Sequence, residues 1–180
     1  MTLLFFILLF VSPAFTTTHT ARDLHDEFSI NISGENSNIQ IKAPVILNEN
    51  QDVYKLDSYL EILEDPAGKL TIENITSSEY IERFEPGHED VPNFGYTNSA
   101  YWVRFCLKNE SKQTENWRLK LDFADMQNID FYMQTQDSEE YIHKKTGTYL
   151  PFETRDIPYP KFVFKIPLKY GTERIVYMRF

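Results

Sequence analysis

Alternation of apolar and polar residues is the feature that most limits how this chain can fold. In segment 101–108 every second residue is Tyr, Val, Phe or Leu, and the residues between them are Trp102, Arg104, Cys106 and Lys108. Segments 117–123, 129–133 and 162–168 alternate in the same way. Successive side chains of a strand point to opposite faces, so this pattern predicts strands with one apolar face. Strands of this length separated by polar turns predict an all-β, antiparallel sandwich or barrel.

Further elements are predicted from weaker signals. Strands are expected at 54–64, centred on Tyr59 and Leu60, and at 140–146 and 174–180. The run Asp65-Pro66-Ala67-Gly68 predicts a turn, because Pro presets φ and Gly permits the reversal. Thr71 is a suitable N-cap for a short helix over Ile72–Ile75, the one helix expected in the chain.

The N-terminus predicts export. Leu3–Val11 is an unbroken apolar run followed by the small residues Ser12, Pro13 and Ala14, the pattern of a signal peptide over residues 1–14. The run is shorter than the roughly 20 residues of a membrane span. Residues 15–50 are expected to form a flexible leader with a short edge strand at Ile39–Leu47.

Residues 51–180 are then expected to form one sandwich domain. No second apolar stretch approaches the length of a membrane span, so the mature chain is predicted to carry no span. The sequence stops inside the last predicted strand, which favours a chain truncated before a further region.

Charge and cysteine content exclude several classes of partner. The net charge is −9 and the pI about 4.9, which argues against nucleic acid and against anionic lipid surfaces. Cys106 is the one cysteine, so no internal disulfide can form, and it is interpreted as a small apolar filler.

Signatures of catalysis and of metal binding are absent. The chain has no G-x-S-x-G, no H-E-x-x-H and no glycine-rich phosphate loop, and His19, His25, His88 and His143 lack metal-ligand spacing. His88-Glu89-Asp90 lies in a polar loop where solvated charges are ordinary. We therefore predict a protein that is not an enzyme and holds no metal or cofactor. Asp122, Asp125 and Asp130 leave a glycosidase as a distant alternative.

The predicted ligand-binding residues are Trp102, Arg104, Tyr132 and Arg155. If Tyr101 and Val103 face the core, Trp102 and Arg104 point to the other face, where Tyr132 extends the surface. Aromatic rings stack on sugars and an arginine fork holds a carboxylate, so a saccharide or a small anion is the expected ligand. The alternative is that Trp102 packs beneath the segment Phe94-Gly95-Tyr96 and that Arg104 forms a structural ion pair.

Seven segments occur in a familiar order. They are Tyr59–Thr71, Asn93–Phe105, Trp117–Leu121, Asn128–Tyr132, Thr146–Gly147 with Leu150–Phe152 and Arg155, Phe162–Phe164, and Tyr177–Arg179. Together they resemble the type-2 extracellular domain of seven-transmembrane receptors with diverse intracellular signalling modules. The resemblance implies a jelly-roll fold like that of carbohydrate-binding modules, displayed in the bacterial periplasm ahead of a membrane region and an output module.

Two functions remain open at this point. The first is an extracytoplasmic ligand-sensing domain of a signal-transduction receptor. The second is a protein-interaction or dimerisation domain without a small-molecule ligand, since exposed aromatic residues beside arginine suit a homodimer equally well.

Overall fold

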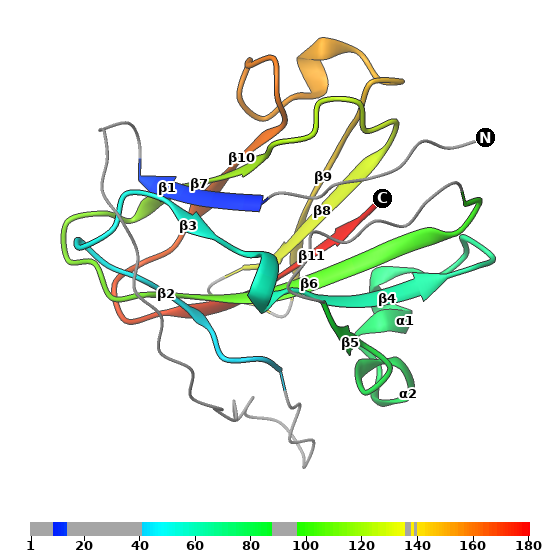
Figure 1. The fold of residues 1–180 in the computed structure, drawn as a ribbon, viewed down its shortest axis with the longest axis horizontal. Helices are drawn as coiled ribbons and strands as arrows, with labels where there is room; N and C mark the ends of the chain where they lie inside the picture. Colours follow the sequence, from blue (N-terminus) through cyan, green and yellow to red (C-terminus); the bar gives the residue numbers. More distant parts are fainter. Residues whose placement is uncertain (1–8, 14–40, 88–96, 136–137, 139) are drawn as a thin grey trace.

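Two β-sheets packed face to face make up the domain. The structure, a computed structural model, describes residues 9–13, 41–87, 97–135, 138 and 140–180. One sheet has the strand order β10-β7-β1-β3, and the larger has the order β5-β4-β6-β11-β8-β9, with β2 also paired to β6 (Figure 1). Apart from the parallel β2–β6 pair, the ladders are antiparallel. The predicted all-β sandwich is confirmed, whereas the jelly-roll connectivity stays a prediction.

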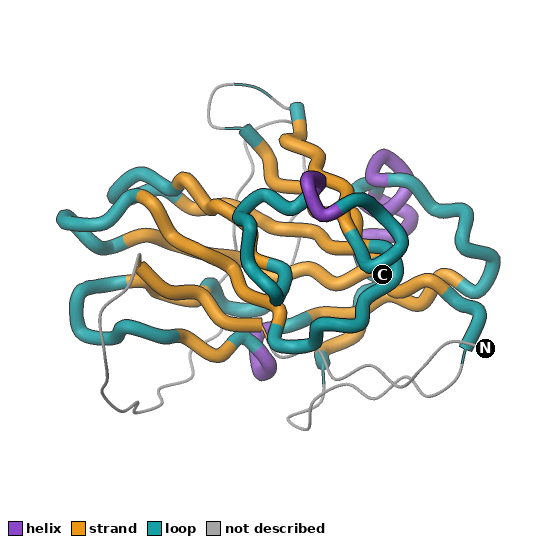
Figure 2. The backbone as a smooth tube through the Cα atoms, turned by 90° about the horizontal axis from the view of Figure 1, so that it is seen from above, coloured by secondary structure: helices purple, strands orange, loops and turns teal. Residues whose placement is uncertain are grey.

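The strands and helices have the following bounds. The strands are β1 (Leu9–Pro13), β2 (Val45–Leu47), β3 (Tyr54–Lys55), β4 (Glu61–Asp65), β5 (Glu85–Pro86), β6 (Ala100–Asn109), β7 (Asn116–Leu121), β8 (Ile129–Gln134), β9 (Tyr141–Thr146), β10 (Val163–Pro167) and β11 (Glu173–Arg179). The helices are α1 (Ile72–Ile75), α2 (Ser78–Ile81) and the 3-10 turns η1 (Asp57–Tyr59) and η2 (Phe152–Thr154). Figure 2 shows the strands forming the body of the domain, with the short helices outside them.

The six strands expected from residue 101 onward correspond to β6 through β11. Their inner faces build one core, in which Val103 and Phe105 of β6 lie with Leu119 of β7. Phe131 of β8 stacks on Phe164 of β10 with ring centroids 4.8 Å apart, which joins the two sheets. Complete burial of each such side chain contributes about 2–3 kcal/mol to the free energy of unfolding.

The segment predicted as one strand over 54–64 is instead β3, η1 and β4. Leu56 and Leu60 are both fully buried, and they are four residues apart. In a strand, two residues at that spacing would lie on one face about 13 Å apart. Here the turn of η1 is closed by the Tyr59 N–H, which donates to the Leu56 carbonyl at 2.8 Å. This turn brings Leu56 and Leu60 into the core. Tyr59 and Leu60 are therefore not the centre of a strand.

A layer of short helices covers the outer face of the larger sheet. Thr71 caps α1 as predicted, in a reciprocal capping box with Asn74. The second helix, α2, was not expected, because four residues are too few to show a helical period. Ile72 and Ile75 of α1 pack with Leu63, Trp102 and other residues in a second buried cluster. The sheet is thus covered on both faces at β4 and β6, and the prediction that one face meets solvent there is wrong.

Five residues of the predicted signal peptide form β1. This strand lies antiparallel between β7 and β3, and Val11 is fully buried in the core. The signal peptide stays a prediction. In the described residues no helix is long and apolar enough to cross a membrane.

Gly147 occupies a position that has no room for a side chain. Its φ is +154°, and a Cβ added there would lie 2.0 Å from the carbonyl oxygen of Gln127. We predict that Gly147→Ala lowers the free energy of unfolding by about 3 kcal/mol or more, because backbone strain of roughly 1–3 kcal/mol adds to the steric clash. Guanidinium unfolding followed by circular dichroism measures it.

Gly171→Ala is the matched control for this prediction. Gly171 has a φ of +73° but nothing within 4 Å of an added Cβ. The cost should therefore be only the left-handed conformation, roughly 1–2 kcal/mol. Equal losses for the two variants would contradict the steric explanation.

Candidate functional site

The outer face of the larger sheet is arranged in two rows of directly opposed residues that run across five strands. From β4 to β9, one row is Glu61, Arg104, Tyr177, Tyr132 and His143, and the other is Leu63, Trp102, Arg179, Asp130 and Lys145. Opposed residues on one face of antiparallel strands have Cβ atoms about 4.5–5.5 Å apart, so each member contacts the next. The β4–β6 ends of the rows lie beneath the helices, whereas the β8–β9 ends reach the surface.

Arg104 is buried, not exposed. Its Nε and Nη2 donate to the two carboxylate oxygens of Glu61 at 2.9 and 3.2 Å, and Nη1 donates to the Ile81 carbonyl at 2.9 Å. The guanidinium also lies over the ring of Phe84, 4.2 Å from the centroid. The alternative of a structural ion pair is correct, and the prediction of a surface arginine is wrong because α2 covers it.

Trp102 is also buried, with 0% of its surface exposed. The ring of Tyr132 lies 5.7 Å from it at 30°, and the Arg179 guanidinium lies over it at 6.0 Å. The prediction that Trp102 forms part of a surface platform is therefore wrong. Its covering includes α1, and the segment proposed to cover it, 94–96, lies outside the described residues.

Arg155 braces a loop. Its Nη1 donates to the carbonyls of Tyr159 and Pro160 at 2.7 and 2.6 Å, and the guanidinium lies over the rings of Phe152 and Phe162. These contacts place it in the β9–β10 connection and against Phe162, the residue before β10 of the smaller sheet. Of the four predicted site residues, Tyr132 alone is a part-exposed ring on the outer face of the larger sheet.

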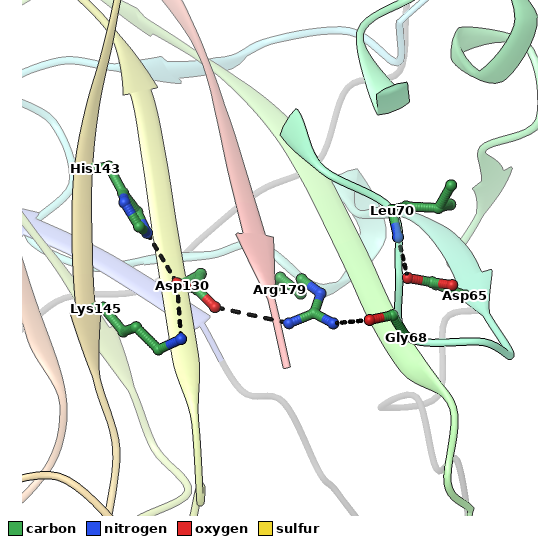
Figure 3. A network of polar contacts seen from close by, with 7 residues as sticks. All are labelled: Asp65, Gly68, Leu70, Asp130, His143, Lys145 and Arg179. Atoms are coloured by element: carbon green, nitrogen blue, oxygen red, sulfur yellow. Dashed lines mark hydrogen bonds and ion pairs between the residues drawn. The ribbon is translucent and has the colours of Figure 1, made fainter. Parts of the chain in front are cut away.

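Asp130 is the centre of the charged group around Tyr132 (Figure 3). Its side chain is 8% exposed and lies 2.8 Å from His143 Nε2, 3.8 Å from Lys145 Nζ and 3.8 Å from Arg179 Nη1. The three partners come from the strands on either side of β8, and Figure 3 shows their side chains directed toward the carboxylate. We call Asp130, Tyr132, His143, Lys145 and Arg179 the outer-face surface.

An aromatic stack forms the second part of this surface. The rings of Tyr132 and His143 are parallel within 2° and 4.3 Å apart, and Trp102 lies on the other side of Tyr132. Burial raises the pKa of the Tyr132 hydroxyl, which therefore remains a neutral donor. The His143 ring is 45% exposed and forms the outer end of the stack.

Arg179 connects the surface to the helical layer. While Nη1 faces Asp130, Nη2 donates to the Gly68 carbonyl at 2.8 Å. Gly68 closes the predicted turn after β4, in which its N–H donates to the Asp65 carbonyl and the Asp65 carboxylate accepts from the Leu70 N–H. The same guanidinium thus contacts both the exposed strands and the segment that leads into α1.

The outer-face surface is cationic in an acidic protein. Lys145 and Arg179 outnumber the single carboxylate of Asp130, which gives a net charge of +1 when His143 is neutral. Lys145 is 53% exposed and can reach an incoming anion. Flat rings beside cations can stack a sugar ring or a planar acid and pair with its carboxylate.

The sequence did not identify the two cations of this surface, Lys145 and Arg179. Lys145 and Arg179 occur in weakly alternating segments, and only the strand register brings them opposite Asp130. The register depends on long-range pairing that no local pattern records.

Two of the three carboxylates weighed for a glycosidase, Asp122 and Asp130, have structural partners, and the third, Asp125, is exposed. Asp122, after β7, pairs with Lys161 and Lys120, and the Lys161 ammonium lowers its pKa. Asp130 belongs to the outer-face surface on the other sheet. Burial raises the pKa of the Cys106 thiol, which agrees with its interpretation as a filler. No group of three acidic, histidine or cysteine residues in the described ranges could share a metal ion, and the segment 88–90 falls outside those ranges.

Comparison with known proteins gives one match. The family model described as 7TMR-DISM extracellular 2 matches residues 57–180, which include every strand from β4 to β11. No curated protein and no solved structure matches the chain.

The buried Arg104–Glu61 pair should dominate the stability of this face. We predict that Glu61→Gln lowers the free energy of unfolding by about 3–5 kcal/mol, because it leaves the Arg104 guanidinium buried without a counter-charge. Replacing both partners, as Glu61→Leu with Arg104→Met, should recover most of that loss. Urea unfolding of the parent chain and of both variants measures these changes.

The exposed pair of Lys108 and Glu110, 2.7 Å apart, provides the control. Glu110→Gln should change the free energy of unfolding by less than about 1 kcal/mol. A Glu61→Gln variant as stable as Glu110→Gln would show that the buried pair does not hold the face together.

Proposed function

This chain belongs to the 7TMR-DISM extracellular 2 family, and on that basis we propose that it is the extracytoplasmic ligand-sensing domain of a bacterial signal-transduction receptor. The family establishes an extracellular receptor domain. The sensing role, the periplasmic location and a binding rather than catalytic action are the proposal.

The outer-face surface carries this proposal. The ligand we propose is an acidic saccharide or a similar small carboxylate, paired with the Lys145 ammonium and stacked on the part-exposed ring of His143 at the outer end of the stack. Trp102 supports the stack from beneath and does not touch the ligand. The proposed site still pairs an aromatic ring with a cation, as the sequence predicted for Trp102 and Arg104, but it lies on β8 and β9 instead of β6.

Arg179 offers a route by which binding can alter the domain. An anion that binds beside Asp130 would compete with it for Nη1 of Arg179, while Nη2 of the same guanidinium donates to the Gly68 carbonyl. A ligand that binds better to one position of this guanidinium shifts the population toward that position. The segment leading into α1 would shift as well, because Gly68 belongs to it.

A pair of sugars that differ in one carboxylate tests the ligand class. The full chain is titrated calorimetrically with galacturonate and with galactose, after a glycan array has ranked other acidic sugars. We expect binding of the acidic member, weakened about tenfold by Lys145→Gln, since tenfold corresponds to ~1.4 kcal/mol, close to the lower end of the range for a hydrogen bond to a charged group.

Lys165→Gln serves as the control, because Lys165 is an exposed lysine on β10 of the other sheet. It should leave binding unchanged. Equal affinity for acidic and neutral sugars, or equal affinity in Lys145→Gln and the parent chain, would reject the outer-face surface as the ligand site.

A protein-interaction role is the second candidate, and a different surface favours it. The β9–β10 connection exposes Tyr149, Phe152 and Tyr159 at 71%, 51% and 45%. Arg155 and the Lys144–Asp156 ion pair at 2.5 Å hold this loop in place. Exposed aromatic rings on a braced loop are typical of anchor residues at interfaces.

Oligomeric state tests this second candidate. If the loop mediates a homodimer, light scattering of the full chain should give twice the monomer mass. The Phe152→Ser variant should then give the mass of a single chain. A parent chain that stays monomeric at high concentration would count against dimerisation through this loop.

A further inference from the structure

β1 fills a gap in the smaller sheet that is one strand wide. All five of its residues pair with β7, from Leu9 opposite Leu121 to Pro13 opposite Trp117, and two of them also pair with β3 on the other side. In the part of the chain that the structure describes, β7 and β3 form no ladder with each other, because β1 lies between them. The smaller sheet is therefore continuous only while a strand occupies this position, which we call the strand slot.

The strand slot lies over the core of the domain. Val11 is fully buried and belongs to the core cluster together with Leu119 and Tyr54, the residues opposite it on β7 and β3. An empty slot would expose this part of the core. It would also leave the backbone N–H and C=O groups on one edge of β7 without partners. We therefore expect a chain that lacks β1 to fill the slot with another strand.

Export would remove β1. The predicted signal peptide covers residues 1–14, so cleavage after Ala14 would take away every residue from Leu9 to Pro13. The exported chain would then begin with the stretch 15–40, which is joined directly to Ile41. Ile41 is buried, so this stretch is anchored at the sandwich and is the nearest source of a replacement strand.

One segment of this stretch matches β1 position for position. Segment 28–32, which lies outside the described residues, reads Phe-Ser-Ile-Asn-Ile and alternates apolar and polar residues, as a strand with one buried face does. In the register of β1, Ile30 would take the buried position of Val11, while Ser29 and Asn31 would take the two outward positions. In the sequence of 15–40 no other window of five residues alternates in this way.

Segment 28–32 is also the better strand sequence of the two. Isoleucine is enriched in strands, and Ile32 would stand where β1 has Pro13, which has no N–H to donate to β7. Residues 33–40 can extend to at most about 27 Å. β2, which follows Ile41, lies in the larger sheet, and packed sheets are only about 10 Å apart, so the segment can reach the slot.

We propose that the strand slot is filled by β1 in the uncleaved chain and by segment 28–32 after cleavage. This replacement keeps the smaller sheet closed and leaves no unpaired edge on β7 to which another chain could add. The proposal rests on the predicted cleavage after Ala14. It is independent of the outer-face surface, which lies on the other sheet, so the failure of either proposal leaves the other standing.

Hydrogen exchange measured by mass spectrometry tests the proposal on two forms of the full gene product. The uncleaved form is expressed in the cytoplasm, and the exported form is collected from the periplasm, where its mass identifies the N-terminus. In the uncleaved form we expect the amides of 9–13 to be protected and those of 28–32 to exchange rapidly. In the exported form the protection of 28–32 should be at least about tenfold higher.

Two substitutions should have opposite effects in the two forms. In the uncleaved form Val11→Asp should lower the urea midpoint of unfolding, because it places a charge in the core, whereas Ile30→Asp should leave it unchanged. In the exported form Ile30→Asp should lower the midpoint. Its matched control there is Asn31→Asp, which should have little effect because that position faces outward. If Ile30→Asp prevents folding of the exported form, Ile30→Ala should give a smaller loss that can be measured.

Three results would overturn the proposal. The first is that the signal peptide is not removed, so that residues 9–13 remain in the exported chain. The second is that segment 28–32 exchanges equally fast in the two forms. The third is that substitutions at Ile30 and at Asn31 change the stability of the exported form equally, which would assign the slot to a different strand.

Discussion

The ion pair between Arg104 and Glu61 is the interaction on which the outer half of the domain depends. The two residues stand directly opposite each other in the β4–β6 ladder, so the pair forms only in the native register. The third donor of the guanidinium binds the Ile81 carbonyl and thereby holds the end of α2 against the sheet. The Arg104 side chain thus fixes both the strand pairing and the docking of α2. Because it is buried, loss of its partner would strongly lower the free energy of unfolding.

The helical layer decides where this domain can meet other molecules. It covers Trp102 and Arg104 and so removes the centre of the sheet from solvent. On this face the side chains become exposed again from Tyr132 on β8 to the residues opposite it on β9. The cation-rich surface there is built around one buried carboxylate, Asp130. His143, Lys145 and Arg179 all pair with it, and the side chains of His143 and Lys145 are 45% and 53% exposed.

Alternation predicted β6, β7, β8 and β10 because their inner faces carry uninterrupted apolar rows, whereas β9 and β11 were predicted from weaker signals. It failed for the outer face, because alternation predicts that a charged residue such as Arg104 is exposed. It cannot predict a guanidinium that is buried together with the carboxylate of Glu61. The helices that cover it are four residues each, below the length at which periodicity can be recognised. Lys145 and Arg179 could not be assigned to a site either, because their neighbours are set by pairing between distant strands.

The position of β9 at the end of its sheet has a consequence for assembly. Its sequence His143-Lys144-Lys145 puts positive charge along an edge whose backbone would otherwise accept another strand. Lysines on an edge strand are a common protection against such addition, since a second copy would bring like charges into register. Addition of a strand from a second copy beside β9 is thereby disfavoured.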